Sequence, residues 1–168
     1  MKMKFKITIV LLLTLLVSCG GDKNDKKKEK FSYQKKSTTE QTSKTKTEKI
    51  PASKKIDLTN KGVGPIQSIT LTENIDKKMA ASGAEVYKKM CTACHRVDKK
   101  FIGPAPKGIL KRRTPEWIMN MILDPEKMVK EDALAKELLW EFNGSPMINQ
   151  GVTEKEARAI LEYFRTLE

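Results

Sequence analysis

Two cysteines and the only histidine of the chain lie together in the segment Cys91-Thr92-Ala93-Cys94-His95. Two thiols separated by two residues at the end of a helix can each add across one vinyl group of a haem. The next residue then lies beneath the iron, where an imidazole can bind. The spacing therefore predicts one haem c, attached covalently through Cys91 and Cys94, with His95 as an iron ligand.

The same segment has three other interpretations, a zinc site, a thioredoxin-like redox pair and a simple disulfide. Structural zinc takes four ligands. The third cysteine of the chain, Cys19, lies near the N-terminus in a segment that resembles a lipidation site, so Cys91, Cys94 and His95 supply only three. Asp or Glu as the fourth ligand is uncommon. A thioredoxin-like pair needs a βαβ setting, whereas the surrounding sequence predicts helices. Haem attachment is the interpretation that the sequence favours.

The second axial ligand cannot be another histidine of this chain, and methionine is the usual alternative. Methionines on predicted helices are first explained by core packing. Met147 differs, because it follows Gly144-Ser145-Pro146 in a loop before the last predicted helix, and Pro146 stiffens that loop. We therefore predict Met147 as the second ligand, chosen from the candidates Met79, Met90, Met119, Met121, Met128 and Met147.

The N-terminus resembles a bacterial lipoprotein signal peptide over residues 1–18. Three early lysines precede an apolar run that is too short for a permanent membrane span, and Leu16-Val17-Ser18-Cys19 resembles a lipobox. Cys19 would then carry two or three acyl chains, which anchor a protein firmly. The alternative is an ordinary signal peptide that ends near a cysteine. We expect an exported lipoprotein that faces the periplasm, with the choice of inner or outer membrane left open.

Composition divides the rest of the chain. Residues 19–61 comprise the lipidated cysteine and a tether rich in Lys, Thr and Ser, whose few apolar residues predict disorder. Residues 62–75 form the first segment with apolar character and are expected to be an extended leader. Residues 76–168 form the folded domain.

Charge is distributed unevenly along the chain, whose formal net charge is +12. Most of the excess lies in the first 61 residues, and residues 62–168 carry only +2, so nucleic acid is not an expected partner. Within the domain, residues 88–113 carry +8 and residues 114–168 carry −5. A basic rim around the haem would dock on acidic redox partners, and an ordinary solvated surface is the alternative.

Helical signals cover the domain, and no strand pattern competes with them. The first helix starts near Ile75 and ends at Cys91, and the second begins with Thr114 as N-cap and Pro115 in the first turn. A third is expected from about Glu131 to Phe142. The last opens with the capping box Thr153-Glu154-Lys155-Glu156 and runs to the C-terminus. The fold class is therefore all-α, a small helical domain around one covalently attached haem.

Residues 76–168 resemble the class I monohaem cytochromes c. In that family a glycine and an aromatic residue on the first helix pack against an aromatic residue on the last helix. Gly83 and Tyr87 stand eight and four residues before Cys91, as the pattern requires, and Tyr163 is placed to be the partner.

The resemblance also implies contacts around the haem. Ile102-Gly103-Pro104 is similar to the family loop in which the proline carbonyl accepts a hydrogen bond from the ligand histidine, which fixes the ring. Ser145-Pro146-Met147 is similar to the family's methionine loop. The resemblance also places Trp117, Arg112 and Arg113 near the haem propionates. The alternatives are core packing for Trp117 and solvent exposure for the two arginines.

A haem whose axial positions are both filled by protein leaves no open iron site for a substrate. We therefore expect a monomeric electron carrier with a positive potential, not an enzyme, that passes single electrons between respiratory complexes. Terminal oxidases, nitrous oxide or nitrite reductases and quinol-oxidising complexes are candidate partners. The alternative is a haem-based sensor or a peroxidase-like haem protein with a labile Met147, although no second histidine is present as a distal acid-base group.

Overall fold

The computed structural model describes residues 50–168, so the predicted signal peptide, Cys19 and most of the predicted tether lie outside the described part. The described residues contain helices and no strand, as the all-α prediction requires. No helix in this part of the chain has the length and apolar character needed to cross a membrane. The elements in chain order are η1 (Ala52–Lys54), α2 (Lys77–Met90), η2 (Ile109–Lys111), α3 (Pro115–Leu123), α4 (Pro125–Glu131), α5 (Ala133–Glu141) and α6 (Glu154–Arg165).

Short polar side chains fix where the α-helices begin. Each caps its helix by accepting a hydrogen bond from a backbone N–H in the first turn, which satisfies one of the donors that a helix start leaves unpaired. Thr153 does so within a complete capping box with Glu156, as the sequence predicted. The N-cap residues of α2 to α6 are Asp76, Thr114, Asp124, Asp132 and Thr153.

The helix predicted from about Glu131 to Phe142 is present as α5, which starts at Ala133, but α4 before it was not predicted. Asp132 has extended backbone angles, with φ −102° and ψ 123°, and its carboxylate caps α5 by accepting from Ala135 N at 2.7 Å. The additional helix α4 begins with Asp124 as its cap and Pro125 in its first turn, the same signal that marked α3.

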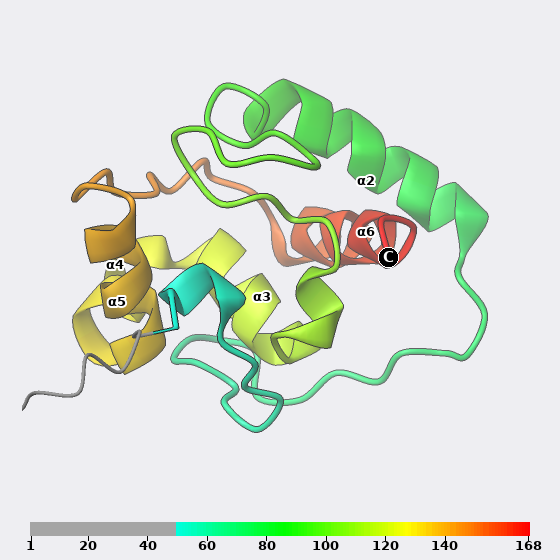
Figure 1. The fold of residues 1–168 in the computed structure, drawn as a ribbon. Helices are drawn as coiled ribbons and strands as arrows, with labels where there is room; N and C mark the ends of the chain where they lie inside the picture. The colour runs from blue at the N-terminus through cyan, green and yellow to red at the C-terminus, as the bar shows by residue number, and fades with distance from the viewer. Residues whose placement is uncertain (1–49) are drawn as a thin grey trace, which may run out of the picture. The chain divides into compact units, whose positions relative to one another are not determined.

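Helices α2 and α6 pack against each other at Gly83, and Figure 1 shows α2 running alongside the red α6. A Cβ atom on Gly83 would lie 1.9 Å from the carbonyl oxygen of Ala159, so only glycine permits this approach. Tyr87, one turn later, packs with its ring centroid 5.5 Å from that of Tyr163 and 5.6 Å from that of Phe164. The contact with Phe164 adds a second aromatic partner to the one expected.

The chain before α2, which we call the strap (residues 50–75), is packed on the domain. The prediction that the tether continues to Lys61 was therefore wrong for residues 50–61. Polar contacts, rather than the apolar burial on which the prediction depended, hold much of this segment. Arg113 donates to the carbonyl oxygen of Ala52 at 2.7 Å, and Asn60 donates to Asp132 at 2.7 Å.

Residues 62–75, predicted as an extended leader, contain neither helix nor strand, and Ile66 and Ile69 in this segment are hydrogen-bonded to side chains of α3. The fully buried side chain of Asn120 on α3 accepts from Ile66 N at 2.9 Å and donates to the Ile66 carbonyl oxygen at 2.9 Å. Glu116 accepts from Ile69 N at 3.3 Å. These side chains pair the backbone of the strap where no strand partner is present.

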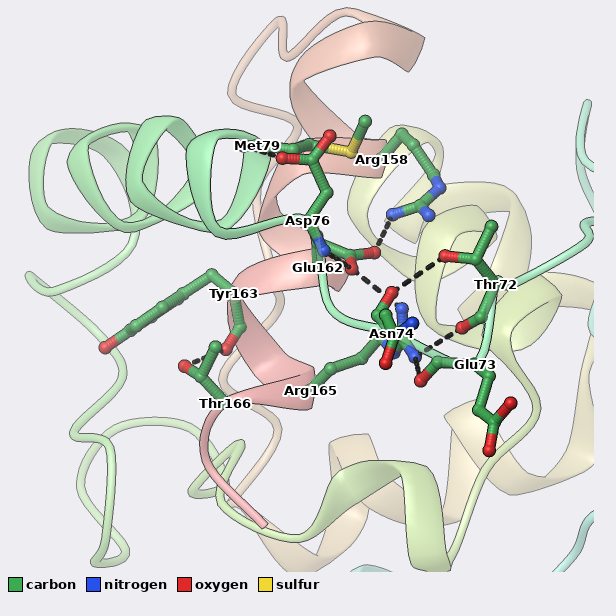
Figure 2. Close-up of polar contacts among 10 residues, drawn as sticks. All are labelled: Thr72, Glu73, Asn74, Asp76, Met79, Arg158, Glu162, Tyr163, Arg165 and Thr166. Carbon is green, nitrogen blue, oxygen red and sulfur yellow. Dashed lines mark hydrogen bonds and ion pairs between the residues drawn. The ribbon is translucent and has the colours of Figure 1, made fainter.

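Glu162, whose side chain is fully buried, lies where the end of the strap and the start of α2 are joined to α6 (Figure 2). Glu162 accepts from Arg158 at 2.6 Å, from Arg165 at 2.7 Å and from Asp76 N at 2.9 Å. Arg165 also donates to the Thr72 carbonyl oxygen at 2.6 Å. Burial opposes ionisation of Glu162, but these hydrogen bonds and positive charges outweigh it and hold its pKa below the ordinary value.

Candidate haem site

The segment with the two cysteines forms a tight turn at the end of α2. The Cys91 N–H donates to the Tyr87 carbonyl oxygen at 2.8 Å and so extends the helical hydrogen bonding by one residue. Cys94 N and His95 N both donate to the Cys91 carbonyl oxygen, at 3.1 and 2.9 Å. One turn of backbone therefore holds the two thiols and the imidazole together.

The two thiols differ in their surroundings. Cys91 is partly buried and Cys94 is exposed, and both are free. Burial, with a smaller effect of Cys94, raises the pKa of the Cys91 thiol to about 11, so this thiol is protonated at neutral pH. No disulfide joins these two residues in the structure, although they are close in sequence.

The His95 ring is oriented by the loop that the sequence singled out. Its Nδ1 lies 2.8 Å from the Pro104 carbonyl oxygen, and since a carbonyl only accepts, Nδ1–H is the donor. The Nε2 lone pair is thereby left for a metal. Gly103 allows the loop to approach, because a Cβ atom there would lie 2.4 Å from Cε1 of the ring.

A second contact to His95 was not expected from the sequence. The buried hydroxyl of Tyr87 donates to the His95 carbonyl oxygen at 3.2 Å, and burial raises the pKa of this phenol well above its usual range. The family resemblance implied only a helix-packing role for Tyr87. The sequence could have indicated this contact, because position 87 is a tyrosine and not a phenylalanine, and a buried hydroxyl needs a hydrogen-bond partner.

A largely apolar cavity opens beside this turn. Its walls come from all five α-helices of the described residues, from η2 and from the loops between them, and one residue comes from the strap. Apolar lining of this kind excludes water from a bound group and leaves few polar atoms to specify its orientation. Residues that define the walls include Cys91, Cys94, His95, Ile102, Pro104, Trp117, Met121, Leu138, Phe142, Met147, Ile148 and the strap residue Ser53.

The six candidate methionines divide into two groups. Met79, Met119 and Met128 do not line the cavity, and Met128 is fully buried with its sulfur accepting from Val63 N at 3.1 Å. The other three do line it, namely Met90, Met121 and Met147. Met90 directly precedes the attachment turn, so Met121 and Met147 are the methionines that other elements bring to the cavity.

The loop with Met147 is set by the end of α5. Asn143 and Gly144 both have left-handed backbone angles, with φ 59° and 72°, and Gly144 N donates to the Leu139 carbonyl oxygen at 2.8 Å. This reverses the chain and leads Pro146 and Met147 back to the cavity.

Trp117 and the two arginines line the cavity, but their donors have partners within the protein. The only N–H of the buried Trp117 ring donates to Asp132 at 3.1 Å. Arg112 donates to the carbonyl oxygens of Lys107 and Gly108, at 3.3 and 2.8 Å. Arg113 is buried, contrary to the solvent-exposed alternative, and donates to carbonyl oxygens of the strap.

These residues fit a covalently bound haem. Two free thiols lie in the same turn beside an apolar cavity. The His95 imidazole lines the same cavity, and its Nδ1 is already hydrogen-bonded to the Pro104 carbonyl oxygen. When bound, the haem supplies one-electron chemistry at its iron. The chain's own residues supply the attachment points, a fixed imidazole and a wall that excludes water.

Comparison with known proteins agrees with this site. The family model described as cytochrome c matches residues 80–168, which is more than half of the chain. The chain belongs to the cytochrome c family. Cytochrome c-551 of Ectopseudomonas mendocina is 33% identical over 89 residues, which cover 52% of this chain and 100% of that protein.

Solved structures give the same result for this cytochrome c. Cytochrome c from Rhodothermus marinus is 38% identical, with a TM-score of 0.61 over 70% of this chain and 93% of that one. An engineered form of the Rhodothermus marinus protein, bound to a carbene intermediate, has a TM-score of 0.58 at 38% identity, over 70% of this chain and 94% of that one. The chain is thus a class I monohaem cytochrome c with covalently attached haem c that functions in electron transfer, and Cys91 and Cys94 fit the attachment motif.

Proposed function

We propose that this cytochrome is a membrane-tethered carrier of single electrons between respiratory complexes on the periplasmic side, with His95 and Met147 as axial ligands. The observation that carries the proposal is that both side chains line one apolar cavity while reaching it from separate loops. With two protein ligands the iron has no open position, so the protein exchanges electrons and does not act as an enzyme.

Met147 is preferred over Met121 because of the segment that carries it. Met121 is part of α3, where the helical backbone limits how far its sulfur can move into the cavity. Met147 follows Pro146 in a loop held at one end by the Asn143-Gly144 turn and at the other by the cap of α6. A thioether ligand together with a buried site favours the reduced form, and we expect a positive midpoint potential.

The proposed docking surface for redox partners is residues 88–113, the basic segment that includes the attachment turn. Seven of its nine basic side chains are exposed, and Ile102 and Ile148, which line the cavity, are exposed as well. An apolar contact surrounded by positive charge suits an acidic partner, because charge steers the encounter and apolar contact holds it briefly. The exposed basic residues are Lys88, Lys89, Arg96, Lys99, Lys100, Lys107 and Lys111.

Charge reversal tests this surface. We expect Lys99→Glu and Lys107→Glu to slow electron exchange with an acidic redox partner about tenfold at low salt, and the difference to shrink as ionic strength rises. Lys136→Glu, an exposed lysine on α5, is the matched control and should have little effect. Equal rates for all three variants at every salt concentration would exclude the basic docking surface.

The tether is tested separately through Cys19. Replacement of Cys19 by alanine should move the haem protein from the membrane fraction to the soluble fraction without changing its absorption spectrum. A protein that stays with the membrane after this change is held by something other than lipid on Cys19. The mass of the mature wild-type N-terminus gives the number of acyl chains directly.

A further inference from the structure

Arg113 is a buried cation in the wall of the haem cavity. Only 3% of its surface is exposed, although it lies at the end of the basic segment whose other members are mostly solvated. Its guanidinium lies over the Trp117 ring, 5.2 Å from the centroid. Burial lowers its pKa from the ordinary value, yet a guanidinium remains charged at neutral pH.

The strap provides two of the oxygens that hold this cation. Arg113 Nη1 donates to the Lys55 carbonyl oxygen at 2.5 Å, and Nη2 donates to the Ala52 carbonyl oxygen at 2.7 Å. A further bond joins Nη1 to the Arg112 carbonyl oxygen at 2.8 Å. These partners are neutral dipoles, so they fix the position of the guanidinium without cancelling its charge.

Further contacts hold residues 53–57 of the strap in place beside Arg113. Ser53 donates to Glu141 on α5 through both its N–H, at 2.7 Å, and its hydroxyl, at 2.5 Å, and Lys55 forms an ion pair with Glu137. Asp57 N donates to the Arg112 carbonyl oxygen at 2.9 Å. Ala52 is buried in the core, and Ser53 lines the haem cavity itself.

Three nearby carboxylates reduce the electrostatic field of Arg113, but each is hydrogen-bonded to groups other than Arg113. Asp57, Asp132 and Glu141 all act on it electrostatically. Asp57 accepts from Thr59 and Asn60 in its own turn, and Asp132 caps α5. Glu141 is held by Ser53, so the strap positions this carboxylate together with the cation.

We propose that residues 51–55 of the strap are a functional part of the haem site, because they hold the Arg113 charge in the cavity wall and close the cavity at Ser53. A fixed positive charge disfavours the more positive oxidised haem, and a closed wall keeps water from it, so both effects raise the midpoint potential. Arg113 is a positioning and tuning residue in this scheme. The inference depends on the haem of the family and not on the membrane anchor or the identity of the sixth ligand.

Equilibrium redox titration of the haem-loaded protein tests the proposal. At the wild-type midpoint, Arg113→Gln should lower the ratio of reduced to oxidised haem about tenfold, a shift of about 59 mV for a one-electron couple. Arg113→Lys, which keeps the charge, should retain most of the wild-type ratio. An unchanged midpoint in Arg113→Gln would overturn the proposal.

A strap variant tests whether the segment acts through the arginine. Ala52→Gln puts a larger polar side chain into a buried position and should release residues 51–55, seen as faster hydrogen exchange at Asp57 N. Ala52→Gln should also lower the ratio of reduced to oxidised haem, and hence the midpoint potential. In the double variant Ala52→Gln/Arg113→Gln, the midpoint should fall by less than the sum of the two shifts that the single variants show. Full additivity of the two changes would contradict the coupling.

Two controls separate this role from loss of stability. Leu58→Gln alters an exposed strap residue and should leave the midpoint unchanged. Asn120→Ala removes the bonds to Ile66, which lie outside the cavity lining, and should weaken the fold in denaturant without moving the midpoint. If Asn120→Ala lowers the midpoint as much as Arg113→Gln does, general loosening and not the cavity wall sets the potential.

Discussion

Gly103 packs directly on the His95 ring, so closely that an added Cβ atom would lie 2.4 Å from Cε1 and 2.8 Å from Nδ1. The same loop brings the Pro104 carbonyl oxygen within 2.8 Å of Nδ1. The absence of a side chain at one position thus allows a backbone oxygen at the next to set the orientation of the imidazole.

Gly103→Ala should therefore rotate or displace the His95 ring. We expect a stability loss of about 1–3 kcal/mol, the usual cost of overpacking, and a changed spectrum of the haem-loaded protein. Denaturant unfolding and the absorption spectrum measure the two effects. Pro104→Ala keeps the carbonyl oxygen and serves as the control, with a spectrum close to that of the wild type. A wild-type spectrum in Gly103→Ala would show that the ring position does not depend on this contact.

Gly83→Ala should destabilise the crossing of α2 and α6. The new Cβ atom would lie 1.9 Å from the Ala159 carbonyl oxygen, which belongs to the backbone of α6 and cannot rotate away. We expect a loss of about 3 kcal/mol or more in the free energy of unfolding, measured in denaturant. Ser82→Ala, at an exposed position of the same helix, is the control and should change stability by less than about 0.5 kcal/mol.

Glu162→Gln tests the buried ion-pair cluster at the end of the strap. Removing the charge leaves Arg158 and Arg165 without their shared counter-ion, and we expect a loss of about 3 kcal/mol in the free energy of unfolding at neutral pH. Glu85→Gln, an exposed carboxylate on α2, is the control.

The pH dependence of this loss has a definite sign. The pKa of Glu162 in the folded protein lies below its ordinary value of 4.5, so its contribution is fully present above that pH. The contribution disappears as pH falls through the folded pKa. The difference in stability between wild type and Glu162→Gln should thus be constant near neutrality and shrink in acid. A difference that grows in acid would contradict the ion-pair account.

The sequence was most informative where chemistry or capping is local. Cys91 to His95 identifies the attachment turn within five residues, and the caps at Thr114 and Thr153 mark helices that start where expected. Asp124 and Pro125 carried the same kind of signal at the start of α4 and were missed, because the seven residues of this helix are too few to show a helical period.

The strap could not be found in the same way. Residues 50–61 have the composition of a solvated linker, and the contacts of the strap join residues far apart in sequence, such as Ala52 with Arg113 and Thr72 with Arg165. Nothing in the local sequence around Ala52 indicates a buried guanidinium 61 residues away. Such long-range polar pairs become visible only when the fold brings them together.

We propose above that His95 and Met147 occupy both axial positions of the haem iron, which is the basis of the electron-carrier function. This ligation is tested most directly by the absorption band of the oxidised protein near the red edge of the visible spectrum, which is assigned to iron–methionine charge transfer. We predict that the wild-type protein shows this band and does not bind carbon monoxide when reduced, that Met121→Leu keeps both properties, and that Met147→Leu loses the band and binds carbon monoxide. A band that persists in Met147→Leu, or carbon monoxide binding by the wild-type protein, would contradict the closed electron carrier.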